Sequence, residues 1–457
     1  MKKKVVACFA FLFAVFMFIS AVSASAAVFQ INFEPKSKGI YFANLDTDTV
    51  VYEKDANLRL EPASCTKIMA YIIAVERISD LQDTKVIVSD YIENTLVNTQ
   101  SSTAGIISGE ELTVLQLLNL MMVPSGNDAS LMLAEYIGGL ENGTTGTEAV
   151  ENFVHLMNEK AAELGCTNTQ FRNPHGLHDT EHYTTAADLY KITKAAMTLP
   201  HFSEITSQLS YTLPATNKSV TARTVYSTNK MISNTAENSK YYYQYAKGIK
   251  TGTHDQAGYC LVSSAVYNGY TYICVALGAP SLDENGNTIE ERADMLDSAS
   301  LYRWAFTNLR LKEVLKSTDI IANMKIDYVW NQDRLLLSPE KDFSTILPND
   351  VDPNSVIVTA NLPEKLEAPV TKGDVIGTAV LSYANQELAT INLVAAETME
   401  KSQLLQVWSV MKTIFSSPWF IAIASVIAFL ILIYIVLMIL YYNRKKKMRK
   451  VKKYRKM

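Results

Sequence analysis

Residues 61–67 read Glu61-Pro62-Ala63-Ser64-Cys65-Thr66-Lys67, and an apolar stripe at helical spacing follows them directly. The stripe runs from Ile68 to Ile78 and predicts a helix whose N-terminal turn holds Ser64. Residues i and i+3 share a face of a helix, so the Ser64 hydroxyl and the Lys67 amine can meet one turn apart. Serine is a weak nucleophile unless a base lies within hydrogen-bond reach, and this spacing supplies one.

An S-x-x-K pair alone is weak evidence, because about two such pairs occur by chance in a chain of this length. Taken alone, the pair is more often a capping serine beside a solvated lysine. Further pairs stand at Ser227–Lys230, Ser338–Lys341 and Ser409–Lys412. The first pair differs because two more motifs follow it in order, Ser125-Gly126-Asn127 and Lys250-Thr251-Gly252-Thr253.

The second motif lies within a stretch, 113–164, that reads mainly as helix. The Ser125 hydroxyl can relay a proton to a leaving amine, and the Asn127 amide can hold a substrate carbonyl. The alternative is a helix cap, in which a serine or asparagine satisfies the amides of the next helix.

The third motif lies on a predicted strand at 248–252, before a predicted hairpin. Gly252 lets a ligand backbone approach closely, while Lys250 and Thr251 offer a cation and a hydroxyl to a carboxylate. The alternative is an ordinary solvated lysine on a strand edge.

The order of elements predicts an α+β fold, an antiparallel sheet flanked by helices. Strands are expected at 40–43 and 50–52 before the helical block, and at 248–252, 259–265 and 270–277 after it, with a closing helix at 301–311. Short alternating runs from about 314 to 396 predict a separate small all-β domain.

Both ends of the chain indicate export and anchoring. Three lysines, an apolar run at 5–19 and Ala24-Ser25-Ala26 predict a cleaved signal peptide, with an uncleaved anchor as the alternative. Residues 419–442 are apolar and uncharged, long enough for a C-terminal transmembrane helix, the alternative being a buried core helix. The basic tail favours a cytoplasmic C-terminus and an extracytoplasmic catalytic domain at the cell membrane. The expected organisation is a signal peptide 1–26, a catalytic domain 27–312, a β-rich domain 313–398, a linker 399–418, a transmembrane helix 419–442 and a basic cytoplasmic tail 443–457.

Charge and cysteine content narrow the function. The net charge is −4, and removing the ten basic residues of the tail and three of the signal leaves about −17 on the body. An acidic body argues against nucleic acid or anionic lipid as its partner. Four cysteines remain after the signal, too few for a disulfide framework, and we expect them to be reduced and mostly buried: Cys65, Cys166, Cys260 and Cys274.

With these motifs in place, residues 30–310 resemble the serine-type D-Ala-D-Ala carboxypeptidases, the low-molecular-mass penicillin-binding proteins. The resemblance includes 62–67, 125–128, Asn173-Pro174-His175-Gly176-Leu177, Tyr183-Thr184-Thr185-Ala186 and 250–253. It implies the penicilloyl-serine transferase fold shared with serine β-lactamases. Residues 368–377 resemble the β domain that follows the catalytic domain in this family.

The resemblance implies a hydrolase without metal or cofactor that trims the terminal D-Ala from peptidoglycan stem pentapeptides through an acyl-enzyme and is inhibited by β-lactams. Ser64 would attack with Lys67 as its base, and Ser125 and Asn127 would assist. Amides of Ser64 and Thr253 would form the oxyanion hole, and the substrate carboxylate would dock along Lys250, Thr251, Gly252 and Thr253. Relatives often use an arginine for this carboxylate. Arg292 is one candidate, and the sequence leaves that assignment open.

Three other functions remain as alternatives: a β-lactamase, a DD-endopeptidase of the same fold, and a non-catalytic wall-binding relative. A class A β-lactamase needs an E-x-x-L-N loop, and the segment after Glu163 does not fit it. Metal binding by His175, His178 and His182 is disfavoured, because their changing spacing around Gly176 places them on a loop.

Overall fold

The computed structural model describes residues 29–97, 99, 101–330, 332–384 and 386–454, which form two compact units. The first unit runs to Glu313 and adds Ser344–Ser355 and Tyr383–Leu388; the second holds Val314–Phe343, Val356–Ser382 and the chain from Ala389. The signal peptide expected at 1–26 lies outside the described residues.

The first unit is built on a five-stranded antiparallel sheet of order β2-β1-β9-β8-β7. Its strands are β1 (Gly39–Asn44), β2 (Val50–Lys54), β7 (Ala246–His254), β8 (Gly258–Tyr267) and β9 (Tyr270–Ala279). The strands predicted on either side of the helical block are therefore confirmed, and β1 pairs with β9 far along the chain. β7 is an edge strand, so among the described residues no strand pairs with the outer side of its backbone.

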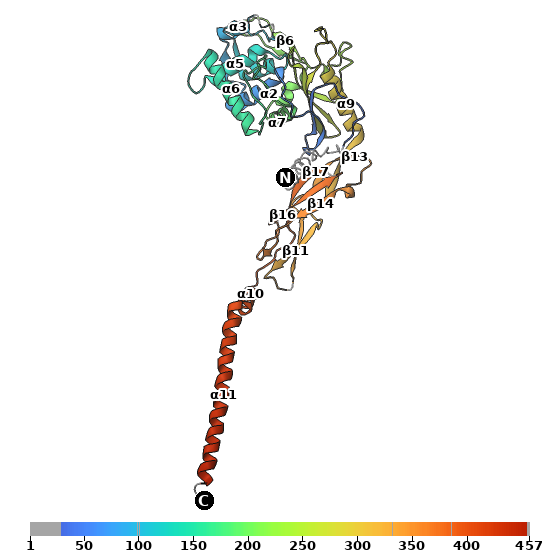
Figure 1. Ribbon diagram of the computed structural model, residues 1–457. Coiled ribbons are helices and arrows are strands. Elements are labelled where there is room, and N and C mark those ends of the chain that lie inside the picture. The colour runs from blue at the N-terminus through green and yellow to red at the C-terminus, as the bar shows by residue number, and fades with distance from the viewer. Residues whose placement is uncertain (1–28, 98, 100, 331, 385, 455–457) are drawn as a thin grey trace, which may run out of the picture. The chain divides into compact units, whose positions relative to one another are not determined.

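Helices cover both faces of this sheet, with α7 packed on β1 and β9 and α9 on β8 and β9 (Figure 1). Successive strand residues alternate between the two cores: Val262 belongs to the core around α2, whereas Leu261 belongs to the core beneath α9. The helices are η1 (Ala63–Thr66), α2 (Lys67–Arg77), α3 (Asp90–Leu96), α4 (Val114–Met122), α5 (Asn127–Gly138), α6 (Gly146–Glu163), α7 (Ala186–Ala196), α8 (Phe202–Thr206), η2 (Lys230–Ile232) and α9 (Ala293–Asn308).

Short strand pairs complete the first unit. They are β3 (Lys85–Ile87) with β4 (Glu111–Thr113), β5 (Ser210–Leu213) with β6 (Arg223–Tyr226), and β10 (Leu309–Leu315) with β13 (Phe343–Pro348). α4 begins where it does because Thr113 and Gln116 form a reciprocal capping box.

The prediction of a closing helix at 301–311 was wrong at both ends of the helix. α9 begins at Ala293, and the chain enters β10 at Leu309. The first turns of α9 were not predicted because two of their buried positions hold aspartates, which breaks the apolar stripe. Asp294 binds Arg292, and Asp297 accepts a hydrogen bond from Ser37. From Leu309 apolar and polar residues alternate, which is the period of a strand.

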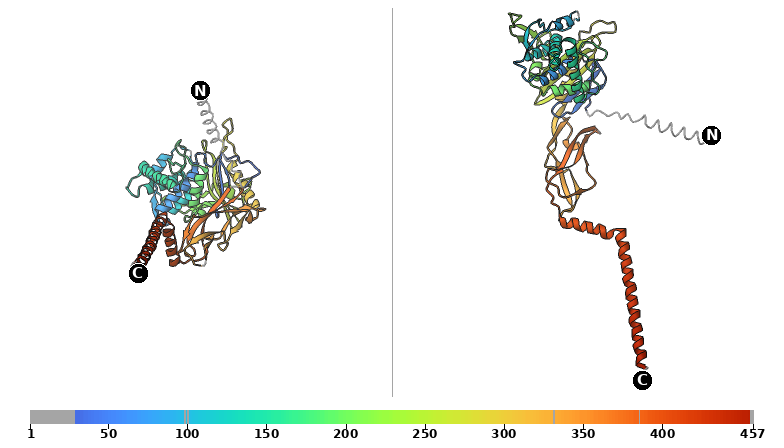
Figure 2. Two further views of the ribbon diagram at one scale, coloured as in Figure 1. Left: turned by 60° about the horizontal axis from the view of Figure 1, so that its bottom comes forward. Right: turned by 90° about the vertical axis from the view of Figure 1, so that its left-hand side faces the viewer.

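The second unit holds most of a six-stranded sheet of order β14-β16-β17-β12-β11-β15, which confirms the prediction of a small all-β domain. Its strands are β11 (Ala322–Asp327), β12 (Arg334–Pro339), β14 (Ile357–Asn361), β15 (Leu366–Glu367), β16 (Val375–Tyr383) and β17 (Gln386–Ala395), with η3 (Pro353–Ser355) between them in the chain. The segment expected as a linker contains helix α10 (Gln403–Ser416). α11 (Pro418–Tyr454) follows (Figure 2), and within the described residues its part Pro418–Lys446 alone is long and apolar enough to span a bilayer.

Candidate active site

Ser64 stands in the 3-10 turn that leads into α2. Ala63 before it has a positive φ of 47°, a conformation that costs a non-glycine residue energy. The Thr66 hydroxyl donates to the Ala63 carbonyl at 2.8 Å and closes the turn. Cys65 is buried, and burial raises the pKa of its thiol to about 12, so it packs as an inert residue, as expected.

Lys67 is fully buried, and its amine has three acceptors. Nζ lies 2.8 Å from Ser64 Oγ, 2.5 Å from Asn127 Oδ1 and 2.9 Å from the His175 carbonyl. Burial, and next the positive charge of Lys250, lower the pKa of Lys67 well below its ordinary value. A lysine with a lowered pKa loses its proton more readily than an ordinary lysine, which suits a base toward Ser64.

The third acceptor comes from a loop whose role the sequence analysis missed. The Asn173 side chain accepts from the Gly176 amide at 2.7 Å and donates to the Leu177 carbonyl at 2.9 Å, which fixes the turn. Gly176 has a φ of 84°, and a Cβ there would lie 1.9 Å from the Ala63 carbonyl oxygen. The Asn-Pro-His-Gly stretch was noticed only through the resemblance, because residue types do not show which backbone carbonyl will accept a hydrogen bond.

The three histidines of this loop have separate partners. His182 Nε2 lies 2.8 Å from the Thr66 hydroxyl, and His178 Nδ1 lies 2.8 Å from the Glu61 carboxylate. His175 accepts from the Leu177 amide at 3.3 Å. Burial is the main cause that lowers the pKa of His175 to about 3 and that of His182 to about 4, so both stay neutral and structural.

The Ser125 motif joins α4 to α5, and Asn127 is the first residue of α5. Ser125 is buried and has a φ of 67°, which the neighbouring chain must enforce. At Gly126 a Cβ would come within 2.7 Å of the Leu120 carbonyl oxygen, so a side chain is excluded there. The Asn127 amide donates to the Ser102 carbonyl at 2.8 Å, which places the loop before α4 against this motif.

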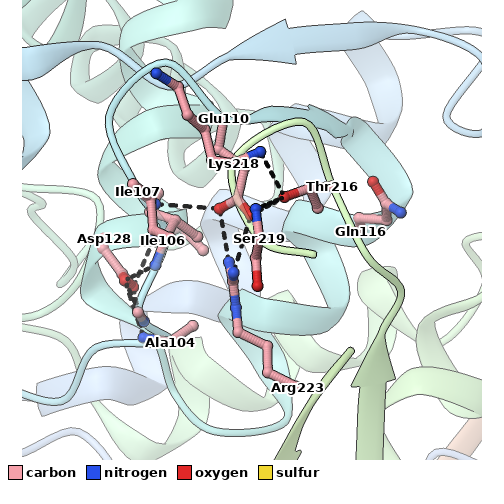
Figure 3. A network of polar contacts seen from close by, with 12 residues as sticks. Ala104, Ile106, Ile107, Glu110, Gln116, Asp128, Thr216, Lys218, Ser219 and Arg223 are labelled. Carbon is pink, nitrogen blue, oxygen red and sulfur yellow. Dashed lines mark hydrogen bonds and ion pairs between the residues drawn. The ribbon is translucent and has the colours of Figure 1, made fainter. Parts of the chain in front are cut away.

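Two buried carboxylates hold that loop (Figure 3). Asp128 accepts from the amides of Ala104, Gly105 and Ile106 at 2.8–3.2 Å. Glu110 accepts from both terminal nitrogens of Arg223, at 2.9 and 2.6 Å, and from the Thr216 hydroxyl at 2.6 Å. The β5–β6 hairpin is thereby tied to the residues that flank Asn127, a connection that nothing in the sequence analysis indicated.

The third motif lies on β7 beside η1. A Cβ on Gly252 would lie 3.0 Å from the Ser64 amide nitrogen, so glycine lets the strand meet the nucleophile's backbone. The Thr251 hydroxyl is 2.5 Å from that of Thr228, while Thr253 is exposed. Lys250 is buried, and burial is the main cause that lowers its pKa to about 8. Its charge also acts on Lys67, so the two amines lie within electrostatic reach.

Arg292 stands at the N-terminus of α9. Its guanidinium binds Asp294 with two hydrogen bonds and lies 4.5 Å from the ring centre of Tyr259. Its charge contributes to the lowered pKa of Lys250. The structure thus places a fixed cation near Lys250, and its use for a substrate carboxylate stays a hypothesis.

Comparisons with known proteins agree with this geometry. A family model described as D-alanyl-D-alanine carboxypeptidase matches residues 25–281, and one described as penicillin-binding protein 5, C-terminal domain, matches residues 311–401. The carboxypeptidase DacF of Bacillus subtilis is 30% identical over 370 residues, covering 80% of this chain and 87% of the relative. DacC of Escherichia coli is 27% identical over 368 residues, covering 79% and 83%.

Solved structures give the same answer for the fold. Penicillin binding protein 5 of Haemophilus influenzae superposes with a TM-score of 0.64 at 25% identity and covers 81% of this chain and all of that one. The carboxypeptidase DacD of Francisella tularensis gives 0.62 at 25% identity and covers 81% and 95%. The chain therefore belongs to the D-alanyl-D-alanine carboxypeptidase family of serine-type hydrolases, with the penicillin-binding protein 5 C-terminal domain after its catalytic part.

Proposed function

We propose that the D-alanyl-D-alanine carboxypeptidase reaction of this chain proceeds through an acyl-enzyme on Ser64. The observation that carries the proposal is the 2.8 Å contact between Lys67 Nζ and Ser64 Oγ, made by a buried lysine with a lowered pKa. Neutral Lys67 takes the Ser64 proton as Oγ attacks the carbonyl of the penultimate D-Ala.

The developing oxyanion needs donors, and two backbone amides are suited to the role. The Ser64 amide lies in the first turn of a helix, where amides have no intrahelical partner, and the Thr253 amide belongs to the edge strand. The approach of Gly252 to the Ser64 nitrogen supports this pairing. Each such donor is worth about 3 kcal/mol to the transition state.

Collapse of the tetrahedral intermediate breaks the peptide bond, and the amine of the terminal D-Ala leaves with a proton relayed through Ser125. Water then attacks the ester, Ser64 regains its proton, and the shortened stem peptide departs. The substrate carboxylate docks along β7 at Lys250 and Thr251, and the Asn127 amide group holds a substrate carbonyl. A β-lactam enters the same path and leaves a slowly hydrolysed ester on Ser64.

The test is Ser64→Ala. The variant should lose both labelling by fluorescent penicillin and release of D-alanine from a soluble pentapeptide. Ser409→Ala is the matched control, because Ser409 and Lys412 form another S-x-x-K pair on the exposed helix α10. Persistence of labelling or release in Ser64→Ala would count against the assignment.

We also propose that residues 1–26 are a cleaved signal peptide and that 419–442 cross the membrane, leaving the catalytic domain outside and the tail 443–457 in the cytoplasm. The signal peptide rests on three lysines, an apolar run at 5–19 and Ala24-Ser25-Ala26. The membrane span rests on the apolar part of helix Pro418–Lys446 and the basic residues after it.

A further inference from the structure

A pocket of the first unit lies away from Ser64. It has a volume of about 620 Å³, within the range of about 300–1,000 Å³ typical of small-molecule sites. Residues 242–245, just before β7, form one side, and Tyr267 at the end of β8 and the last turns of α9 form the others. On the neighbouring strand β8, Tyr245 lies beside Val266 and Lys250 beside Val262. These positions are four residues apart, or about 13 Å, so the pocket is separate from the catalytic site.

Aromatic rings form the walls of this pocket and hold one another in place. The ring centres of Tyr245 and Tyr267 are 4.4 Å apart, and Phe306 lies 6.0 Å and 5.4 Å from them. Tyr243 is 5.5 Å from Tyr245 at an angle of 82°. The Val266 amide donates to the Tyr245 carbonyl at 3.0 Å, so the backbone fixes the rings as well. The walls are therefore preformed.

Polar groups stand at the edges of these walls. Within the described part of the chain, no hydrogen bond joins the hydroxyls of Tyr243, Tyr245 and Tyr267 to another residue, nor the side chains of Gln244 and Arg303. Arg303 contacts the Tyr243 ring at 5.7 Å through its guanidinium. Burial raises the pKa of Tyr243 to about 12, which keeps its hydroxyl a donor. The pocket thus offers aromatic faces together with unused donors and acceptors.

This combination selects a ligand with apolar faces and polar edges. A pyranose ring has both: its axial C–H groups pack on aromatic rings, and its hydroxyl and acetamido groups take hydrogen bonds in the ring plane. Arg303, the charged residue of the lining, suits a carbonyl or carboxylate on the sugar.

We propose that this pocket binds pyranose rings of the peptidoglycan glycan strand, the N-acetylated sugar polymer that carries the stem peptides. The proposal rests on the proposed function, because the glycan strand is the polymer that carries the stem peptides proposed there as the substrate. A bound strand would keep the enzyme on the wall while successive stem peptides reach Ser64.

Binding can be measured on the full-length protein in a detergent without a sugar head group. The probe is glycan strands freed of their stem peptides by an amidase. Tyr267→Ala removes one wall of the pocket. Arg303→Gln removes the positive charge of an exposed side chain that lies over the Tyr243 ring. The matched control is Tyr226→Ala, because Tyr226 is 71% exposed on β6 and does not line the pocket.

We expect wild type and Tyr226→Ala to bind equally, Tyr267→Ala to bind at least about 10-fold more weakly and Arg303→Gln about 5-fold more weakly. All should release D-alanine from a soluble pentapeptide alike, whereas both pocket variants should act more slowly on polymeric wall. Absence of glycan binding by wild type, or equal binding by the pocket variants, overturns the proposal. So does tighter binding of a glucosylated teichoic acid, the other polymeric source of pyranose. Glycan binding without pentapeptide cleavage would instead contradict the proposed function alone.

Discussion

Two buried lysines set the chemistry at the scale of single residues. Lys67 and Lys250 are both removed from water, and the charge on Lys250 makes a second charge on Lys67 costly. The pair therefore favours one cation and one neutral amine. In the proposed mechanism Lys67 is the neutral amine, because its Nζ lies 2.8 Å from Ser64 Oγ, and Lys250 keeps the charge for the substrate carboxylate.

This division of roles predicts a bell-shaped pH profile for kcat/KM on a pentapeptide. Activity rises with pH as Lys67 loses its proton, which occurs well below the ordinary lysine pKa. It falls again as Lys250 loses its proton, with a pKa of about 8. Lys250→Arg should remove the fall between pH 7 and 10, because an arginine stays charged to a pKa above about 12. An unchanged alkaline limb in Lys250→Arg would assign that limb to another group.

At the scale of elements, the site depends on how closely β7 approaches η1. A Cβ at Gly252 would lie 2.7 Å from the Pro62 carbonyl oxygen and 2.9 Å from Ala63 Cβ, as well as near the Ser64 amide. The neighbouring atoms are backbone or a methyl group, so the strand itself must move to make room.

Gly252→Ala should therefore lower the rate of acylation by penicillin about 100-fold, because a shift of about 1 Å in a catalytic geometry has that effect. The melting temperature should fall by a few degrees at most, since the change lies at a sheet edge. Stopped-flow labelling gives the rate, and Lys247→Ala, at an exposed position of the same strand, is the control. Acylation at the wild-type rate would show that the oxyanion hole does not need this approach.

The Glu110–Arg223 pair joins the β5–β6 hairpin to the loop beside Asn127. Burial alone would raise the pKa of Glu110, but hydrogen bonds from Arg223 and Thr216 outweigh it and lower the pKa. A carboxyl with a lowered pKa stabilises the fold above its unfolded pKa, and that contribution is lost as pH falls through the folded pKa.

Arg223→Met leaves Glu110 buried without its cation and should lower the free energy of unfolding at pH 7 by about 3–5 kcal/mol. Adding Glu110→Gln should restore part of that loss, because the double variant has no unpaired buried charge. Urea denaturation of the two variants and wild type measures both effects. A double variant less stable than Arg223→Met would contradict this account.

The elements that could be predicted from the sequence are those with a periodic or local signature. The strand pairs, α2 and the three motifs were predicted because alternation, helical stripes and short motifs are visible in one stretch. The Glu110–Arg223 pair joins residues 113 positions apart, and the His175 carbonyl acts through its backbone. No local pattern marks either, so both appear only once the chain is folded.

At the scale of the whole molecule, the C-terminal helices differ in kind. α11 is apolar on all sides over residues 419–442. α10 instead exposes one apolar stripe at helical spacing, formed by Leu404, Trp408, Met411 and Phe415. A helix of this second kind lies at a membrane surface rather than across it, and binds reversibly.

Three chain lengths should therefore fractionate differently in a bacterial host. The full chain should stay in membranes after an alkaline wash, because a helix that crosses the hydrocarbon core, as proposed for α11, is not released by it. A chain ending at Ser416 keeps α10 and should sediment with membranes at low salt but leave them in the wash. A chain ending at Lys401 lacks both helices and should be soluble while releasing D-alanine at the full rate, since the three motifs lie in the first unit. Release of the full chain by the alkaline wash would contradict the transmembrane assignment. Retention of the chain ending at Ser416 after the same wash would show that α10 anchors the protein.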